Sequence, residues 1–385
     1  MRFIHLGDLH LGKSLGEFDL IDDQRYILNR ILEIIDKKKI DSVLIAGDVY
    51  DRAVPSEAAT NLLDYFLRSL ASRKVNTFMI SGNHDSDDRL GYGSSLFETN
   101  RIYISSKFTG TLSRQTLCDE YGELNIYCLP FVKASQVRHF FPEDKIENYD
   151  AAVRTILKHA DIDFEKRNVI AAHQFVAGRG ADPELGGSEG VGTQSVGLVE
   201  KISYDCWDGF DYVALGHIHS PQRVGREEVR YSGSPLKYSL SEVNNAKSVP
   251  VVTLGEKGKV DIELIPLRPM RNMRHLRGPI EKLLDKANVS GPEDFIYATL
   301  TNEDIISDAM GIMQQVYPNT VKIDYDNSHT RELDRLDIKA ITEHRSFSEL
   351  ISDFYGKMYN CEISEEELQV MMETAKEAGV IDETD

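Results

Sequence analysis

The sequence predicts a layered α/β fold for the first half of the chain, and three observations support this. Short apolar runs that are typical of buried strands recur along it. Two longer stretches with apolar residues every three or four positions lie between these runs and indicate amphipathic helices. The two kinds of segment alternate, which is typical of helices packed on a mainly parallel sheet. In order, the segments are 2–7 (strand), 22–38 (helix), 42–46 (strand), 56–73 (helix) and 77–80 (strand).

Both predicted helices have one apolar face. The face of the first helix consists of Ile27, Leu28, Ile31, Leu32 and Ile35. The second helix begins after Pro55 at Ser56, a residue type that often caps helices. Its apolar residues are Leu62, Leu63, Phe66, Leu67 and Leu70. Each helix is therefore expected to pack against a sheet.

Later apolar runs predict further strands and set the domain limits. They lie at 169–172, 212–215, 249–254 and 260–265, and the last two are linked as in a meander. An arginine-rich segment without acidic residues follows, with Arg268, Arg271, Arg274 and Arg277. A strand at 295–300, a helix at 304–315 and a strand at 320–325 then indicate a small α/β unit. We predict domains at 1–267 and 268–328, and a linker with a helical tail at 329–385.

Composition narrows the class of protein. The chain has 385 residues, more than one hydrophobic core usually supports. It contains no apolar run of eighteen residues, so we expect no membrane span, and no signal peptide fits its first residues. The four cysteines are scattered, which favours reduced thiols and a cytoplasmic location over disulfides or a zinc knuckle.

The net charge of −19 is unusual for a protein that binds nucleic acid, because backbone binding normally needs clustered Lys and Arg. About half of the excess lies in the tail, where residues 331–385 contain 15 acidic and 6 basic residues. Acidity on an exposed tail can serve solubility alone. We therefore expect that any affinity for DNA depends on a partner.

Polar motifs follow five of the predicted strands, at the end where open α/β sheets place their sites. They are Asp8-Leu9-His10, Gly47-Asp48-Val49-Tyr50-Asp51, Gly82-Asn83-His84-Asp85, His173 and Gly216-His217-Ile218-His219. Each motif alone is weak, since a single His or Asp at a strand end is more often structural. Together they supply carboxylate, imidazole and carboxamide groups from five strand ends, which indicates a metal centre.

This mixture of ligands suits the hydrolysis of phosphate esters. Two cations about 3.5–4 Å apart can neutralise a phosphate, activate water and stabilise the leaving oxygen. Holding them so close requires a bridging carboxylate. Imidazole and carboxamide ligands favour Mn, Fe or Zn, whereas an all-oxygen cage would favour Mg or Ca.

The order of these motifs resembles that of the calcineurin-like metallophosphoesterases, and the resemblance to SbcD-type nucleases extends over nearly the whole chain. It includes Gly47 to Ser56, Ala172-His-Gln-Phe-Val176, Gly209 to His219 and Tyr231-Ser-Gly-Ser-Pro-Leu-Lys-Tyr-Ser239. The resemblance implies a four-layer α/β/β/α metallophosphoesterase sandwich with a small α/β capping domain and a helical C-terminal tail.

The resemblance also implies roles for the site residues. Asp48 would bridge two Mn²⁺ ions, for which Mg, Fe or Zn are possible substitutes. One ion would also bind Asp8, His10 and His219, and the other Asn83, His173 and His217. His84 would face the scissile phosphate as the catalytic residue. Asp51 and Asp85 would lie behind the metals or the catalytic His, or would only cap loops.

The activity implied is that of a Mn-dependent exonuclease on double-stranded DNA and an endonuclease on single strands or hairpins, within an ATP-dependent complex for DNA repair, recombination and replication. ATP would enter through an SbcC-type coiled-coil ATPase, since the sequence has no Gly-x-x-x-x-Gly-Lys loop. The family forms homodimers in a heterotetramer. A phosphatase on the same fold and a scaffold without activity are alternatives, although none of the seven ligands is missing.

Two surfaces have open interpretations. Tyr231 to Pro235 and the four arginines are candidate phosphate contacts, or a strand-ending turn and solvated linker charge. In the tail, Ser346 to Glu349 and Ser364 to Glu367 fit helix capping boxes. The first tail helix would carry an apolar stripe that binds the ATPase or folds back on the capping domain, and the resemblance favours the ATPase. The stripe consists of Phe347, Leu350, Ile351, Phe354, Tyr355 and Met358.

Overall fold

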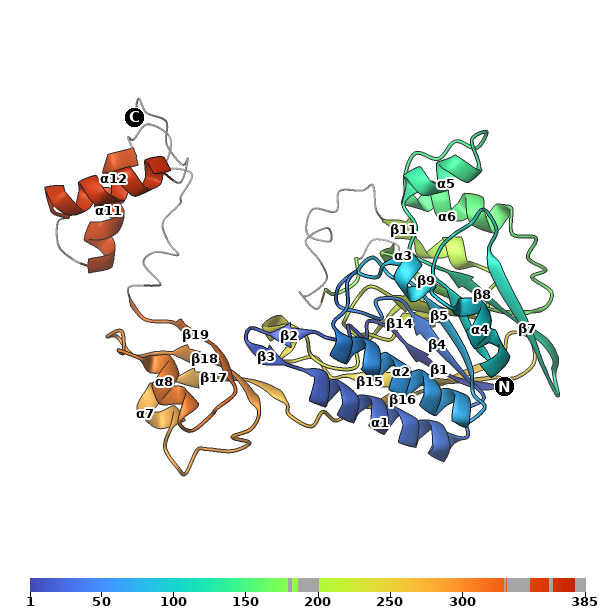
Figure 1. The fold of residues 1–385 in the computed structure, drawn as a ribbon, viewed down its shortest axis with the longest axis horizontal. Coiled ribbons are helices and arrows are strands. Elements are labelled where there is room, and N and C mark those ends of the chain that lie inside the picture. The colour runs from blue at the N-terminus through green and yellow to red at the C-terminus, as the bar shows by residue number, and fades with distance from the viewer. Residues whose placement is uncertain (179–181, 186–200, 329, 331–346, 360–362, 378–385) are drawn as a thin grey trace. The chain divides into compact units, whose positions relative to one another are not determined.

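The structure is a computed structural model that describes residues 1–178, 182–185, 201–328, 330, 347–359 and 363–377 (Figure 1). The chain divides into two compact units, Met1–Met273 and Arg274–Asp385. The division lies shortly after residue 267, the predicted end of the first domain. Among the described residues, no helix is both long enough and apolar enough to cross a membrane.

The first sheet of the N-terminal unit contains the predicted strand–helix alternation. Its six strands have the order β16-β15-β1-β4-β5-β6. The pairs β1–β4, β4–β5 and β5–β6 are parallel, and β15 and β16 extend the sheet in antiparallel pairs. The strands are β1 (Arg2–Leu6), β4 (Ser42–Ala46), β5 (Asn76–Ile80), β6 (Ile102–Ser105), β15 (Ser248–Leu254) and β16 (Val260–Pro266).

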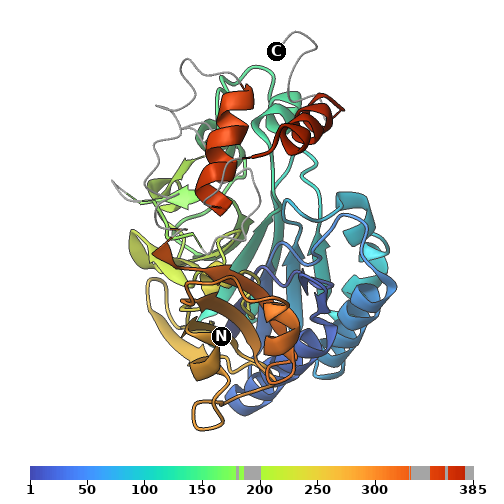
Figure 2. The ribbon, with the colours of Figure 1, turned by 90° about the vertical axis from the view of Figure 1, so that its left-hand side faces the viewer.

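The two predicted helices are α1 (Ile21–Lys38) and α2 (Glu57–Ser72). Their predicted apolar faces are buried. Ser56 is the cap of α2, since its hydroxyl accepts a hydrogen bond from the backbone N–H of Ala59 at 3.2 Å. Figure 2 shows both helices, in blue, along one side of the unit. Short elements complete this region: β2 (Ser14–Leu15), β3 (Phe18–Asp19), α3 (Asp87–Leu90), α4 (Ser94–Phe97) and η1 (Glu98–Asn100).

The second sheet has the order β13-β14-β12-β9-β8-β7, with a parallel centre. Its strands are β7 (Ser113–Asp119), β8 (Gly122–Leu129), β9 (Arg167–His173), β12 (Tyr212–Gly216), β13 (Gln222–Val224) and β14 (Arg226–Tyr231). Of these, β9 and β12 match predicted strands, whereas the β7–β8 hairpin, β13 and β14 do not. β7 and β14 contain many polar residues, so pairing with their neighbours rather than local hydrophobicity makes them strands.

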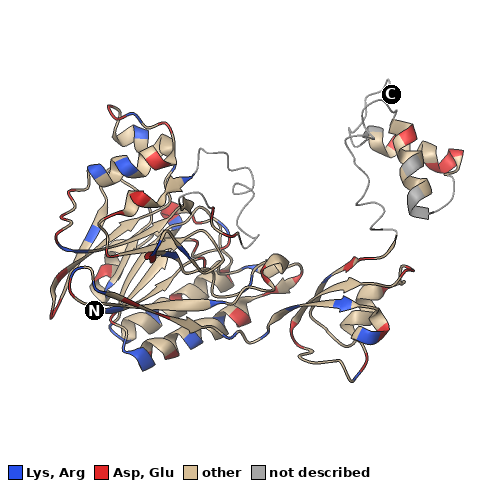
Figure 3. Ribbon diagram, turned by 180° about the vertical axis from the view of Figure 1, so that it is seen from behind, with Lys and Arg blue, Asp and Glu red and all other residues tan. Residues whose placement is uncertain are grey.

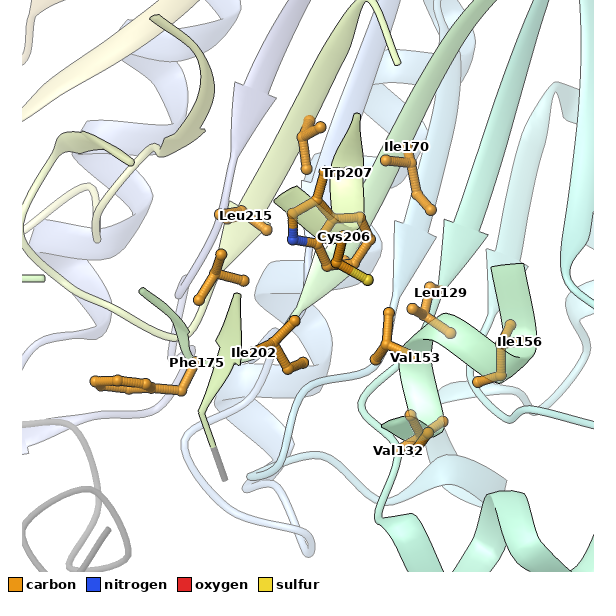
Figure 4. Packing of buried hydrophobic residues seen from close by; sticks show 14 of the residues in the cluster. Leu129, Val132, Val153, Ile156, Ile170, Phe175, Ile202, Cys206, Trp207 and Leu215 are labelled. Atoms are coloured by element: carbon orange, nitrogen blue, oxygen red, sulfur yellow. The ribbon is translucent and has the colours of Figure 1, made fainter. Parts of the chain in front are cut away.

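The two sheets pack face to face. Side chains from both, among them Phe3, Leu44, Ile126 and Tyr212, form the buried layer between them. The outer face of the second sheet is covered by a cluster around Trp207, shown in Figure 4. That cluster involves α5 (Ala134–Phe140), α6 (Tyr149–Lys158), β10 (Val176–Ala177), β11 (Ile202–Ser203) and η2 (Tyr204–Trp207). With α1 and α2 on the other side, the α/β/β/α sandwich is confirmed.

The second unit contains a three-stranded sheet in the order β17-β18-β19. Its elements are β17 (Met273–Gly278), α7 (Ile280–Leu283), β18 (Phe295–Leu300), α8 (Ala309–Gln314) and β19 (Thr320–Tyr325). Both predicted strands have their predicted limits. The helix is shorter than predicted because Asp308, at φ 52°, caps it through the N–H of Gly311.

The described tail contains α11 (Phe347–Tyr359) and α12 (Glu365–Glu377). Ser364 and Glu367 form the predicted capping box, with the Ser364 N–H donating to the Glu367 carboxylate at 3.1 Å and the Glu367 N–H to the Ser364 hydroxyl at 3.3 Å. The first turn of α12 is acidic (Figure 3). The predicted cap at Ser346, the acidic stretch before it and the side chain of Met358 lie outside the described residues.

Candidate metal centre

The strand ends of both sheets converge at one place. Asp8 and His10 follow β1, Asp48 follows β4, and Asn83 and His84 follow β5, all in the first sheet. In the second sheet, His173 ends β9, and His217 and His219 follow β12. All seven predicted ligands therefore meet where the two sheets are stacked, although they come from distant parts of the sequence.

Four of these residues have left-handed backbone conformations. Asp8 has φ 53°, His10 φ 42°, Asp48 φ 47° and His217 φ 99°. Such conformations cost of order 1–3 kcal/mol for residues other than glycine and cluster at functional sites. The backbone at this edge is strained where the predicted ligands stand, which is the pattern expected of a site selected for function.

The first group of ligands consists of Asp8, His10 and His219. Their ligand atoms lie within 4.8 Å of one another, and all three residues are buried. The Nε2 atoms of His10 and His219 are 3.1 Å apart. Behind the rings, His219 Nδ1 lies 3.4 Å from Glu242 Oε1, and His10 Nδ1 lies 3.5 Å from Asp51 Oδ1.

This geometry favours a cation between the two imidazoles. When both Nδ1 atoms carry the proton that faces a carboxylate, both Nε2 lone pairs point at each other. Two facing lone pairs repel unless a positive charge lies between them. Asp8 Oδ2 is also buried with no hydrogen-bond partner among the described residues. A buried acceptor without a partner is rare, and an ion would satisfy it.

The second group consists of Asp48, His173 and His217, again within 4.8 Å. Asn83 belongs with them, because its Oδ1 atom lies 3.1 Å from His173 Nε2 and 3.0 Å from His217 Nδ1. His173 Nδ1 donates to the backbone carbonyl of Ala46 at 2.8 Å. This bond fixes the tautomer and leaves His173 Nε2 as a ligand atom.

Asp48 lies between the two groups. Its Oδ2 atom is 3.6 Å from His10 Nε2 and 3.3 Å from His173 Nε2. Its Oδ1 atom accepts the backbone N–H of His84 at 2.9 Å, which fixes the carboxylate. Its carboxylate reaches an imidazole of each group, as a bridging ligand requires.

The electrostatics of the buried centre also favour a positive charge. Burial raises the pKa of Asp8 to about 6. Burial lowers the pKa of His10 to about 4 and that of His217 to about 3. Burial acts to lower the pKa of His173 as well, but the charge and hydrogen bond of Asp48 outweigh it and raise this pKa to about 9. The negative charge of Asp48 thus favours a proton on His173. A bound metal cation would neutralise the same charge and leave His173 free to act as a ligand.

His84 lies beside the first group. Its ring stands 4.8 Å from that of His10, and its Nδ1 lies 3.1 Å from the backbone carbonyl oxygen of Asp51. Because a carbonyl only accepts, Nδ1 carries the proton and Nε2 is left for other chemistry. The Asp51 carboxylate, besides facing His10, pairs with Lys13 at 2.8 Å.

Asp85 does not contact His84 in any described hydrogen bond. Its carboxylate accepts the N–H groups of Val49 at 3.0 Å, Tyr50 at 2.9 Å and Gly82 at 2.9 Å. These bonds tie the loop after β4 to the loop after β5. The geometry is that of the loop-capping alternative.

The candidate phosphate contacts have internal partners instead. Tyr231, Ser232 and Ser234 are buried, and the Tyr231 hydroxyl donates to the Gln174 carbonyl at 2.9 Å. Three of the four arginines form ion pairs: Arg271 with Asp23, Arg274 with Asp294 and Arg277 with Asp326. Arg271 and Arg274 are partly buried in their ion pairs, whereas Arg277 is exposed and remains solvated.

Apart from Asp51, the groups that support the ligands from behind are absent from the sequence-based prediction. Glu242, Lys247 and the Ala46 carbonyl contact ligand residues from 23 to 127 positions away in the chain. Spacing gives no signal for such contacts. Of these three groups, only Glu242 has a signal in the sequence, because it lies shortly after the Tyr231–Ser239 stretch that carries the family resemblance.

The residues present fit a divalent metal site. They combine carboxylate, imidazole and carboxamide donors, which suit first-row transition metals. An orphaned carboxylate oxygen and a pair of facing ring nitrogens lie at the centre of the cage.

Comparisons with known proteins show the family to which the chain belongs. A family model described as "Calcineurin-like phosphoesterase" matches residues 1–221, and one described as "Type 5 capsule protein repressor C-terminal domain" matches residues 269–359. The SbcD subunit of the nuclease SbcCD from Staphylococcus epidermidis (strain ATCC 12228 / FDA PCI 1200) is 32% identical over 375 residues, which cover 95% of each chain. A dimetal phosphatase structure from Danio rerio has 10% identity and a TM-score of 0.36, over 70% of this chain and 99% of that one. The chain belongs to the calcineurin-like metallophosphoesterases and, within them, to the SbcD family of nuclease subunits.

Proposed function

We propose that the chain is the nuclease subunit of an SbcCD-type complex and hydrolyses DNA phosphodiesters with two Mn²⁺ ions. The observation that carries this is the position of Asp48, whose Oδ2 atom lies 3.6 Å from His10 in one ligand group and 3.3 Å from His173 in the other. The full-length similarity to a nuclease subunit supports DNA as the substrate. We further propose exonuclease activity on duplex ends and endonuclease activity on single strands and hairpins.

The two ligand groups define the metal sites of this proposal. Asp8, His10 and His219 would hold one ion, and Asn83, His173 and His217 the other, with Asp48 common to both. Bound ions would supply Lewis-acid stabilisation of the phosphate and a water of lowered pKa. The chain itself buries six of the seven ligands at least in part and fixes the ring orientations from behind.

His84 is the proposed catalytic residue. Its Nδ1 proton is bonded to the Asp51 carbonyl, so Nε2 is the atom that would exchange a proton with the leaving oxygen or contact the phosphate. The backbone N–H of the same residue donates to Asp48. His84 is therefore fixed at two points relative to the bridging carboxylate.

The test of this role is His84→Gln. The variant should bind Mn²⁺ as the wild type does and lose most cleavage of linear DNA. Bis-p-nitrophenyl phosphate and its monoester, assayed side by side, distinguish a diesterase from a phosphatase on this fold. Anomalous scattering from a manganese-soaked crystal would count the ions. Full exonuclease activity in His84→Gln would refute the assigned role.

The C-terminal tail is the proposed site for the ATPase partner. In α11, Phe354 is 53% exposed, and Phe347, Leu350, Ile351 and Tyr355 are only partly buried. An amphipathic helix with such a face is a common docking element. Deleting residues 340–385 should leave Mn-dependent cleavage intact and abolish co-purification with an SbcC-type ATPase. Retained co-purification would refute the tail as the docking site.

We also propose a homodimer, with an exposed apolar patch on α4 and the turn before it as its interface. Tyr92 is 84% exposed and Leu96 73%, and Phe97 lies beside them in sequence. Exposed apolar patches often mark protein contacts. The double variant Tyr92→Glu/Leu96→Glu should be monomeric in light scattering while its fold and metal binding persist. A dimer in that variant would place the interface elsewhere.

A further inference from the structure

A buried ion pair lies behind the first metal site. Glu242 and Lys247 stand between β14 and β15, and 0% and 7% of their surfaces are exposed. Lys247 Nζ lies 2.5 Å from Glu242 Oε2 and also donates to the Ser234 hydroxyl at 2.8 Å. Burying two charges costs several kcal/mol per ion, and an apolar pair of similar volume is often as stable. A contribution to fold stability is thus a weak explanation for the presence of this ion pair.

Both members of the pair contact the same predicted ligand. Glu242 Oε1 faces His219 Nδ1 at 3.4 Å, and Lys247 Nζ donates to the backbone carbonyl of His219 at 2.8 Å. The ring and the main chain of His219 are therefore fixed together. With its Nδ1 proton directed at Glu242, the imidazole presents its Nε2 lone pair to Asp8 and His10.

The other imidazole of this site also has a carboxylate behind it, at ion-pair distance and without a hydrogen bond. His10 Nδ1 faces Asp51 Oδ1 at 3.5 Å, and Asp51 pairs with Lys13 at 2.8 Å. In the second group, by contrast, His173 Nδ1 donates to the neutral backbone carbonyl of Ala46. A carboxylate partner raises the basicity of an imidazole ligand more than a neutral carbonyl does.

We infer that Glu242, held by Lys247, is a positioning residue that fixes the tautomer and orientation of His219 and so sets the affinity of the first metal site. The inference rests on the proposed two-metal function. The pair Lys13–Asp51 stands behind His10 at ion-pair distance. The first site thus has two lysine–carboxylate pairs behind it, and the second relies on main-chain support at His173.

The experiment is calorimetric titration of Mn²⁺ into metal-free protein. The double variant Glu242→Gln/Lys247→Met removes both charges, so no unpaired buried ion remains. We expect one Mn²⁺ to bind about 10–100-fold more weakly and the other to bind as in the wild type. Glu242→Asp keeps the charge but shortens the side chain, and should give the same selective loss if the double variant does not fold.

The control is another carboxylate–lysine pair in the same unit, the buried Asp211 with the exposed Lys257 at 3.0 Å. Asp211→Asn/Lys257→Met should leave both Mn²⁺ affinities unchanged. Two wild-type affinities in a folded Glu242 variant would overturn the inference and leave the proposed function intact. A wild-type chain that binds no Mn²⁺ would refute the proposed function and this inference with it.

Discussion

A substitution at Gly47 tests how closely the two sheets must approach each other to form the candidate metal centre. It follows β4 directly and precedes Asp48, and its φ is +82°. A Cβ atom at this position would lie 2.4 Å from His173 Nδ1 and 2.7 Å from His173 Cγ. Gly47→Ala therefore combines an unfavourable backbone conformation with a collision against a predicted ligand.

The magnitude follows from two contributions. A left-handed conformation costs an alanine roughly 1–2 kcal/mol relative to glycine. Overpacking in a dense interior adds typically about 1–3 kcal/mol. The ring of His173 must also move away from Ala46, and its 2.8 Å hydrogen bond would lengthen. We expect the free energy of unfolding to fall by about 2–5 kcal/mol, the sum of these two costs, with loss of the second metal site.

Gly258→Ala is the matched control. Gly258 has φ +79°, and a Cβ atom there would meet nothing within 4 Å. It shares the backbone cost of Gly47→Ala without the collision. Urea denaturation in EDTA gives the two stability changes, and Mn²⁺ titration gives the sites. If Gly47→Ala is no more destabilising than Gly258→Ala and binds two Mn²⁺ ions, the packing argument is wrong.

Three further predictions concern charge. Burial and the nearby Arg230 lower the pKa of His5 to about 3, so below pH 6.5 the unfolded chain binds more protons than the folded chain. Between pH 7 and pH 5 the free energy of unfolding of the wild type should therefore fall by about 2 kcal/mol relative to that of His5→Phe. A difference that is independent of pH in urea denaturation would contradict this. Mn²⁺ at 100 times its dissociation constant should stabilise the chain by about 2.7 kcal/mol per site, and Asp48→Asn should lose most of this shift in melting temperature; an unchanged shift would exclude Asp48 as a bridge. Arg271→Ala leaves the buried Asp23 without this partner and should lower the free energy of unfolding by about 3 kcal/mol, while DNA affinity in filter binding changes little. Unchanged stability with weakened DNA binding would instead support Arg271 as a phosphate contact.

The predictable part of the fold is the part with local signals. Apolar periodicity and the Ser56 cap identify α1, α2 and three of the parallel strands of the first sheet, β1, β4 and β5, but not β6. β7 and β14 have no such signal, because neighbouring strands supply their partners. β17 illustrates the same limit. Its arginines predict a basic linker, yet it is a strand whose charges pair with Asp294 and Asp326.

The identity of the candidate ligands was determined by the sequence alone, because carboxylate, amide and imidazole groups stand at five strand ends and their chemistry is local to each residue. The tertiary structure decided how these groups face one another. It alone shows that Asp48 lies between two groups, that Asp85 ties two loops, and that Glu242 and Lys247 contact His219. Such relations depend on which atoms two stacked sheets bring within hydrogen-bonding distance, and distance along the chain does not specify them.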